Sequence, residues 1–296
     1  MSTLKNKIDF ALVFTATNAN PNGDPLDGNR PRTDFRGIGE VSDVCLKRKI
    51  RNRLLDLNEN IFVQSDDKRN DEYRSLRDRA DGCADLKEKK NDRPAYAKKA
   101  CETWFDVRAF GQVFAFKENK NKKDNEEENS DSVSIGIRGP VSIQSAFSCD
   151  TVNITSMQIT KSVNLETGSD PDRKGRDTMG MKHRVDFGMY TTFGSINTNL
   201  AEKTGFSDED ADKLKQALLT LFTNDESSAR PSGSMEVVKL IWWMHNCPAG
   251  QYSPAKVHRL LKVERKPGIE NPVSAEDYDI TVNELPGLAY EVLDGE

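Results

Sequence analysis

The sequence predicts an α+β fold in which a ferredoxin-like βαββαβ unit carries two insertions. Three observations predict this class. Several segments alternate apolar and polar residues with period two, two other segments repeat apolar residues at helical spacing, and all of them follow in the order strand, helix, strands, helix, strand. We expect one domain that spans residues 1–296.

A strand, a loop and a helix open the chain. Apolar residues occupy every second position from Ile8 to Phe14, which indicates a strand with one buried face. Residues 18–39 are rich in Asn, Pro and Gly and predict an irregular loop. From Ser42 to Leu57 apolar residues recur at helical spacing, and Asp43 stands in the first turn, where the helix dipole favours an anion. Basic residues fill much of the remaining helix surface.

Two insertions follow the helix. Residues 64–99 mix charges and contain few large apolar groups, so we expect exposed helices with little core of their own. Aromatic and β-branched residues in 104–116 and the alternation in 133–143 predict strands. The intervening segment 118–131 is almost devoid of apolar residues, and we expect it to be a disordered loop.

The second half of the chain contains a predicted hairpin, a helix and a strand. Segments 157–163 and 181–192 alternate and are joined by a stretch rich in Gly, Asp and Arg, which predicts a long protruding hairpin. Ser207 begins a capping-box variant before an apolar helical stripe. The last clear strand is predicted at 237–244, where two tryptophans are expected in the core.

The charge is unevenly distributed. The whole chain has a net charge of -5, yet eight acidic residues and no Lys or Arg lie from Glu270 to the end. The remaining body is therefore mildly basic, which is compatible with a nucleic-acid ligand. The acidic end is either a solvated tail or a segment that docks onto a basic face of a neighbouring copy. No segment has the length and apolarity of a membrane span or signal peptide, and we expect a cytoplasmic protein.

Little in the sequence supports catalysis. The five cysteines are scattered without a C-x-x-C pair, the three histidines share no metal-binding spacing, and neither a phosphate loop nor a nucleophile elbow is present. We therefore predict no catalytic residue, no metal and no cofactor. A histidine cluster would have to be assembled entirely by tertiary structure.

Basic residues concentrate at two places. Arg36 in the loop is followed by the basic helix Lys47 to Arg53, which is able to neutralise phosphates without reading bases, although a solvated helix face explains the pattern about as well. The second group, Arg173 to Arg176 and Lys182 to Arg184, lies on or near the predicted hairpin, together with two methionines. Cations and flexible apolar groups on a hairpin suit gripping phosphates and wedging against bases.

Several motifs in one order resemble the backbone subunit of type I-C CRISPR Cascade complexes, the Csd-two family of the Cas-seven superfamily. The match covers most of the chain up to Tyr190. Each piece is weakly specific, whereas the ordered set is strongly so. The motifs are NPNGDP at 20–25, PRTD at 31–34, GEVSDVCLKRKIRN at 39–52, RAFG at 108–111, IRGPV at 137–141 and MGMKHRVDFGMY at 179–190.

The resemblance implies an architecture like a right hand. Such proteins combine a palm that resembles an RNA-recognition module (RRM-like) with helical fingers and a hairpin thumb. It implies fingers at about 60–103, a thumb at about 148–187 and a palm built from the two strand-rich ends. It also implies that copies line up head to tail along CRISPR RNA (crRNA), bind its backbone and leave guide bases free to pair with target DNA in antiviral defence.

We expect a non-catalytic subunit on this basis. The implied partners are crRNA, target DNA through the guide, further copies of the chain, other Cascade subunits and a recruited helicase-nuclease, with no membrane. The expected RNA-binding residues are Asn20, Arg36, Lys47, Arg48, Lys49, Arg51, Lys161, Lys182, His183 and Arg184, and the expected thumb wedge is Met179 and Met181.

Two alternatives stay open. Some type III relatives cut target RNA with an acidic residue of a palm loop, so the rival function is a metal-dependent endoribonuclease that uses the 20–34 loop, with Asp24, Asp27 and Asp34. We favour no cleavage, because the sequence offers these carboxylates no obvious acid-base partner. The third possibility is a structural assembly protein that merely picks up RNA.

Overall fold

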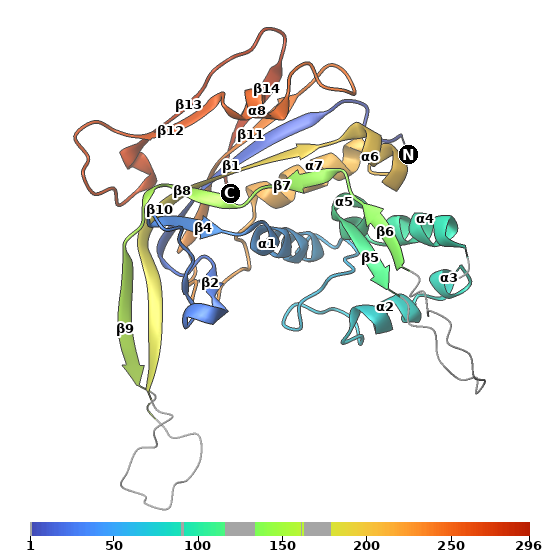
Figure 1. The fold of residues 1–296 in the computed structure, drawn as a ribbon, viewed down its shortest axis with the longest axis horizontal. Coiled ribbons are helices and arrows are strands. Elements are labelled where there is room, and N and C mark those ends of the chain that lie inside the picture. The colour runs from blue at the N-terminus through green and yellow to red at the C-terminus, as the bar shows by residue number, and fades with distance from the viewer. Residues whose placement is uncertain (1, 90–91, 116–133, 161, 163–178) are drawn as a thin grey trace, which may run out of the picture.

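The computed structural model describes residues 2–89, 92–115, 134–160, 162 and 179–296. Its centre is an antiparallel sheet whose strands follow the order β14-β11-β1-β10-β8-β4, with β7 and β9 also paired to β10 (Figure 1). The strands are β1 (Ile8–Ala19), β4 (Ile38–Val41), β7 (Val141–Ile143), β8 (Ala146–Thr151), β9 (Ile154–Thr160), β10 (Met179–Ile196), β11 (Met235–Met244) and β14 (Ala289–Asp294). The mixed fold with a large antiparallel sheet agrees with the predicted α+β class.

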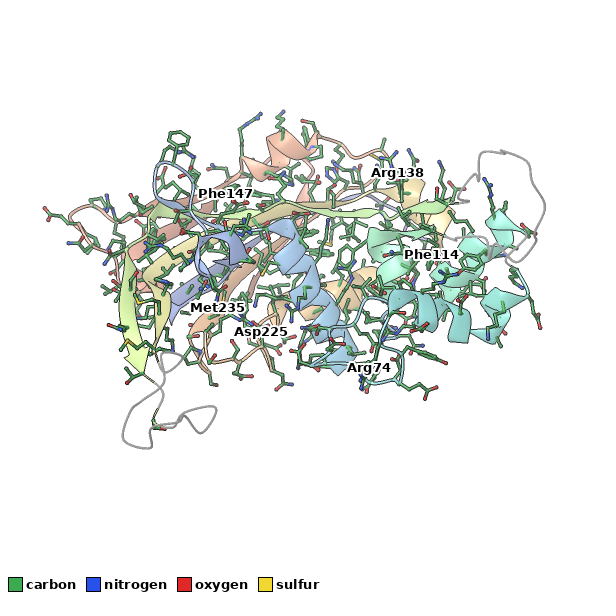
Figure 2. The ribbon with its side chains drawn as sticks, turned by 60° about the horizontal axis from the view of Figure 1, so that its bottom comes forward. Arg74, Phe114, Arg138, Phe147, Asp225 and Met235 are labelled. Carbon is green, nitrogen blue, oxygen red and sulfur yellow. The ribbon has the colours of Figure 1, made fainter. Side chains whose placement is uncertain are left out.

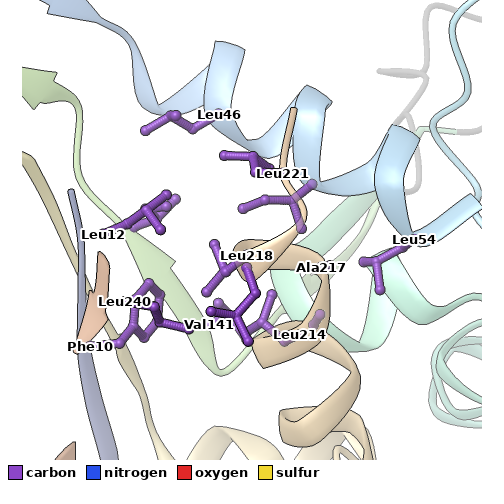
Figure 3. Close-up of a cluster of buried hydrophobic side chains, with 14 of the residues drawn as sticks. Phe10, Leu12, Leu46, Leu54, Val141, Leu214, Ala217, Leu218, Leu221 and Leu240 are labelled. Atoms are coloured by element: carbon purple, nitrogen blue, oxygen red, sulfur yellow. The ribbon is translucent and has the colours of Figure 1, made fainter. Parts of the chain in front are cut away.

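Two helices cover one face of the sheet. Helices α1 (Asp43–Asp56) and α7 (Asp208–Leu219) pack their apolar stripes against β1 and β11 in the main hydrophobic core (Figure 3). The side chain of Ser42 caps α1, and Ser207 forms a capping box with Asp210 at the start of α7. Both helices were predicted in these places, and the strand that contains Trp242 and Trp243 was too.

The opposite face of the sheet is also covered, so the prediction of a first strand with only one buried face is wrong. Ala11 and Val13 point away from the helices and are fully buried under α8 (Pro254–His258), β12 (Leu261–Arg265) and β13 (Tyr278–Val282). The residues between the large apolar side chains of β1 are themselves small and apolar, which allows a second layer to pack on them. We call this cover the C-terminal layer.

The acidic end of the chain belongs to this fold, so the expectation of a solvated tail is wrong for it, while docking of this end onto a neighbouring copy stays a prediction. Strand β14 pairs with β11 as an edge strand of the main sheet. Glu291 forms an ion pair with Lys215 of α7 at 2.9 Å, and Asp294 forms one with Lys239 of β11. Cations from distant segments therefore balance part of the acidic charge within the molecule.

The insertion between α1 and β7 has a core of its own. It contains α2 (Leu76–Gly82), α3 (Ala84–Lys87), α4 (Arg93–Thr103), α5 (Phe105–Phe110), β5 (Gly111–Ala115) and β6 (Ser134–Arg138). Phe62, Tyr96, Trp104 and Phe114 pack together in it, so the expectation of little core is wrong. Residues 105–110 form a helix rather than a strand. From this helix Val107 packs into the core of the insertion, and Ala109 packs into the main hydrophobic core.

A two-stranded ribbon projects from the sheet. Strand β10 is 18 residues long, and its first part pairs only with β9, from Met179 opposite Thr160 to Arg184 opposite Thr155. We call this pair the β-ribbon; it extends away from the sheet on the side of α1 (Figure 1). The predicted pairing of these segments is confirmed. The expected disordered loop at 118–131 and the hairpin's connecting stretch lie outside the described residues.

Within the described part of the chain, no helix combines the length and apolarity needed to span a membrane. The remaining elements are small: η1 (Pro25–Asp27), β2 (Gly23–Asp24), β3 (Arg30–Pro31), α6 (Thr198–Thr204) and η3 (Ala275–Asp277). All five cysteines are described, and each is a free thiol.

Candidate nucleic-acid interface

The loop of residues 18–37 is anchored to the start of α1. Strands β2 and β3 form a short antiparallel pair, and Asn18, Gly28 and Asn29 adopt the left-handed backbone conformation that Asn and Gly tolerate. The side-chain oxygen of Asn22 accepts hydrogen bonds from the backbone nitrogen and the hydroxyl of Ser42, both at 2.9 Å. Because Ser42 caps α1, these bonds fix the loop against the helix N-terminus.

The same loop also contacts the β-ribbon. A guanidinium nitrogen of Arg30 donates to the hydroxyl of Ser156 on β9 at 3.1 Å, and the Nδ1 atom of His183 on β10 shares a 2.8 Å hydrogen bond with that hydroxyl. The loop therefore links the ribbon to α1. Figure 2 turns this side toward the viewer, with α1 between the ribbon and the insertion.

The two faces of the ribbon carry different side chains. Met179, Met181 and His183 stand at alternate positions of β10 and share one face, because side chains alternate along a strand. Lys182 and Arg184 occupy the other face. The methionines are 66% and 56% exposed, unusual for large apolar residues. The predicted hairpin group is thus divided, and the face with the methionines and His183 is the one that meets the loop.

Two of the predicted cations of α1 are accessible. Lys47 is partly exposed and forms an i,i+4 ion pair with Asp43 at 3.1 Å. Arg48 is exposed and reaches Asp67 of the insertion at 3.5 Å. Exposed pairs of this kind are weak and exchange readily for another anion.

The other two predicted cations of α1 form ion pairs in the protein interior. The side chain of Lys49 is 4% exposed and its ammonium pairs with Asp225, so the prediction that Lys49 lies on the helix surface is wrong. Burial lowers the pKa of Lys49, although the carboxylate of Asp225 opposes that shift. Arg51 donates at 2.9 Å to the buried carboxylate of Asp106, which also accepts from the backbone nitrogens of residues 62 and 63. Both cations tie α1 to neighbouring segments (Figure 2 labels Asp225).

The remaining predicted RNA contacts occupy different environments. Asn20 is buried, and its amide donates to the backbone oxygen of Asn29 at 2.6 Å, which is a role within the loop. Arg36 is exposed at a hairpin tip, where it pairs with Asp34 at 2.8 Å. Lys161 lies outside the described residues.

The acidic residues of the loop have structural partners. Asp24 caps the short helix η1 through the backbone nitrogen of Leu26 and lies 3.3 Å from Arg32. Asp34 accepts from two backbone nitrogens of its own turn. The described residues contain no group of three or more His, Cys, Asp or Glu side chains placed to hold a metal ion. Asp24 and Asp34 therefore hold the short helix and the turn of this loop in place.

Sequence reasoning missed a buried polar cluster at the other end of β1. Asp9 is fully buried and accepts from the ammonium of Lys7 and from Nε2 of His245, both at 2.9 Å. The backbone nitrogen of Gln251 donates to Nδ1 of His245, so the neutral ring carries its proton on Nε2. His258 donates from Nε2 to a backbone oxygen at 3.1 Å. An acidic residue among the apolar residues at the start of a strand was the available signal.

A cavity of about 770 Å³ adjoins this cluster. Lys7, Arg138 and His258 line it together with hydroxyl and amide side chains. It opens between the C-terminal layer and α6 and shares no lining residue with the loop, α1 or β9. It is therefore separate from the surface between α1 and the β-ribbon.

The described elements define an α+β protein built on an antiparallel sheet, with a helical insertion, a projecting ribbon and exposed cations and methionines between them. A family model described as "CRISPR-associated protein Cas7" matches residues 6–283. The chain belongs to the Cas7 family.

One named protein and two solved structures are similar to this chain. A protein of Haloferax volcanii named "CRISPR-associated protein Cas7" is 29% identical over 245 residues, which cover 79% of this chain and 68% of that protein. Two solved structures are similar at lower identity. A "CRISPR RNA-guided surveillance complex, pre-nicking" chain has a TM-score of 0.46 at 14% identity and covers 80% of this chain and 78% of its own. A second surveillance-complex chain has a TM-score of 0.44 at 15% identity, covering 80% and 68%.

Proposed function

We propose that this chain is the non-catalytic backbone subunit of a type I-C CRISPR Cascade effector, which binds crRNA on the surface between α1 and the β-ribbon. The observation that carries the proposal is the 18–37 loop, which hydrogen bonds to both elements and so joins their cations and exposed methionines into one surface. Membership of the Cas7 family supports it.

The packing of the sheet supports this location. RNA-recognition modules bind RNA on an open sheet face, where aromatic residues stack on bases. In the RRM-like palm proposed here, the C-terminal layer buries much of that face, including Ala11, Val13 and Trp243. The RNA is therefore expected on the side of the ribbon, where cations and flexible apolar side chains are accessible.

Each group has a distinct role in the proposal. Arg30, Lys47, Arg48 and His183 contact phosphates, and Met179 and Met181 wedge against bases as the thumb. Lys182 and Arg184 contact phosphates from the opposite face of the ribbon. Asn20, Lys49 and Arg51 act indirectly, because they fix the loop and the helix. A surface of this kind recognises backbone and shape, so the guide bases remain free to pair with target DNA.

The proposal includes a cellular setting. Copies associate head to tail along crRNA in the cytoplasm, beside other Cascade subunits, and a separate helicase-nuclease is recruited to cut the target. A heterologous contact that does not close generates such an open row. Its length is then limited by the length of the RNA.

RNA binding by α1 is tested with a charge variant and a matched control. Replacing Arg48 by Ala is expected to weaken RNA binding about equally for all sequences and to reduce the slope of log K against log salt by about one. Lys262 is also an exposed cation, on the C-terminal layer, and Lys262→Ala is expected to change neither quantity. Equal effects of the two variants contradict the proposed surface. Sequencing of RNA that co-purifies with the chain decides between crRNA and random transcripts.

A further inference from the structure

A tight hairpin displays Phe35 and Arg36 at its tip. Thr33 and Gly39 form a β-bridge, the backbone nitrogen of Asp34 donates to the oxygen of Ile38 at 2.9 Å, and Gly37 adopts a left-handed φ of 80°. This is a three-residue hairpin loop in which the third residue needs the left-handed conformation that glycine provides. We call it the Phe35 tip.

The tip is held rigidly. The carboxylate of Asp34 accepts from the backbone nitrogens of Arg36 and Ile38 at 2.8 and 3.0 Å and from Nε of Arg36 at 2.9 Å. The backbone oxygen of Gly37 also accepts from the nitrogen of Val152 at 3.0 Å. Phe35 is nonetheless 97% exposed. A fixed aromatic ring beside a guanidinium has the composition of an interface anchor, because aromatic residues and Arg dominate binding hot spots.

An apolar cavity on the insertion has a suitable size for this ring. Its volume is about 200 Å³, and Phe62, Leu76, Ala80, Val113 and Phe114 are among its lining residues. An apolar cavity of about 150 Å³ is large enough to bind benzene. Leu76 and Val113 are exposed at the same cavity, so it is open to a side chain from outside.

A carboxylate lies beside this cavity. Asp81 lines the cavity together with Arg77, whose Nε atom is 3.7 Å from the partly exposed Asp81 carboxylate. A guanidinium that accompanies a ring into the cavity would approach this carboxylate, and Arg prefers such carboxylate partners.

The tip and the cavity cannot meet within one chain. The tip packs on Thr151 at the end of β8 and precedes β4, whereas the cavity belongs to the insertion that follows α1. The 14 residues of α1 separate β4 from the insertion by about 21 Å. In Figure 2, Phe147 of β8 and Phe114 of the cavity lie well apart.

We propose that the Phe35 ring of one copy inserts into the cavity of the next copy, with Arg36 beside Asp81. The inference rests on the proposed head-to-tail row of copies and names the residues that join one copy to the next. A protrusion at one end and a cavity at the other form a heterologous contact, which repeats without closing. Arg36, predicted from the sequence as an RNA contact, is thereby assigned to the contact between copies.

Photo-crosslinking tests the contact directly. The chain is prepared with p-benzoylphenylalanine at position 35, bound to crRNA, irradiated and digested for mass spectrometry. We expect crosslinks between position 35 and Leu76, Val113 or their neighbours in another copy. Crosslinks to RNA, to other surfaces, or none at all in an assembled row overturn the inference. If the unmodified chain forms no multi-copy row on RNA, the proposed function itself fails, and native mass spectrometry separates that result from the others.

Charge variants at exposed positions provide a second measurement. Phe35→Lys and Val113→Glu are each expected to weaken cooperative assembly on RNA about tenfold, as the loss of a hot spot does. The two together place opposite charges across the contact and are expected to recover part of the loss. Val273, an exposed apolar residue between β12 and β13, is the control, and Val273→Ser should assemble normally. Additive losses in the double variant contradict the pairing.

Discussion

Helix α1 and the β-ribbon both appear basic in the sequence, but the structure uses their cations differently. In α1 the side chains of Lys49 and Arg51 pair with the buried or nearly buried carboxylates of Asp225 and Asp106. The ribbon keeps its polar and apolar side chains accessible on both faces. The density of Lys and Arg in a helix is therefore a poor measure of surface charge, because acids from distant segments neutralise part of it.

The largest expected effect concerns the buried pairs. Replacing Asp106 by Ala leaves Arg51 and two backbone nitrogens without their acceptor, and we expect the free energy of unfolding to fall by about 3–5 kcal/mol. Urea unfolding measures it. Asp27 is an exposed carboxylate in the loop, so Asp27→Ala should change stability by less than about 0.5 kcal/mol. A comparable small change for Asp106→Ala would show that α1 does not depend on this pair.

A smaller effect is expected from the ribbon, and it concerns RNA rather than stability. Replacing Met179 and Met181 by Ser removes the proposed wedges from exposed positions, so unfolding should be unchanged while RNA affinity falls about tenfold. The salt dependence should stay as in the unmodified chain, because no charge is lost. Ile159, an exposed apolar residue on the other face of the ribbon, is the matched control. An equal loss in Ile159→Ser would mean that the face of the ribbon does not matter.

The smallest expected effect lies outside both regions, in the cluster around Asp9. Burial, the largest influence, lowers the pKa of His258, although Asp9 opposes that shift. Burial tends to raise the pKa of Asp9, but hydrogen bonds from His245 and Lys7 outweigh it and lower the pKa overall. In both cases the unfolded chain binds protons more readily, so acidification favours unfolding.

Stability should therefore decline as the pH falls below the ordinary histidine pKa of about 6.5, and further in the acid range where Asp9 titrates. His258→Asn should reduce the first part of this decline, as measured by thermal unfolding between pH 8 and 5. His183→Asn, on the ribbon, serves as the control. A decline that is identical in all three proteins would remove His258 from this account.

Local signals in the sequence predicted where helices and strands lie better than they predicted what surrounds each side chain. Ser42 and Ser207 cap helices through atoms three residues away, so short motifs were sufficient to place α1 and α7. The pairing of the ribbon strands was also visible, because alternation persists on both sides of the connecting stretch.

Long-range packing was not visible. The partner of Lys49 is Asp225, 176 positions away, and no local sequence pattern near either residue predicts the pair. The cover over Ala11 and Val13 comes from residues beyond 250, where the sequence contains short strands between turns and no strong periodicity. The candidate surface was found only in outline for the same reason: its loop anchors, Asn22 to Ser42 and Arg30 to Ser156, depend on tertiary structure.

Crosslinking of guide RNA that contains 4-thiouridine tests the central claim most directly. The account predicts that modified peptides come from the β-ribbon, the 18–32 part of the loop and the first half of α1. Peptides from residues 254–282, which cover the opposite face of the sheet, should be unmodified. Crosslinks concentrated in that C-terminal layer, with none on the ribbon, would contradict the account.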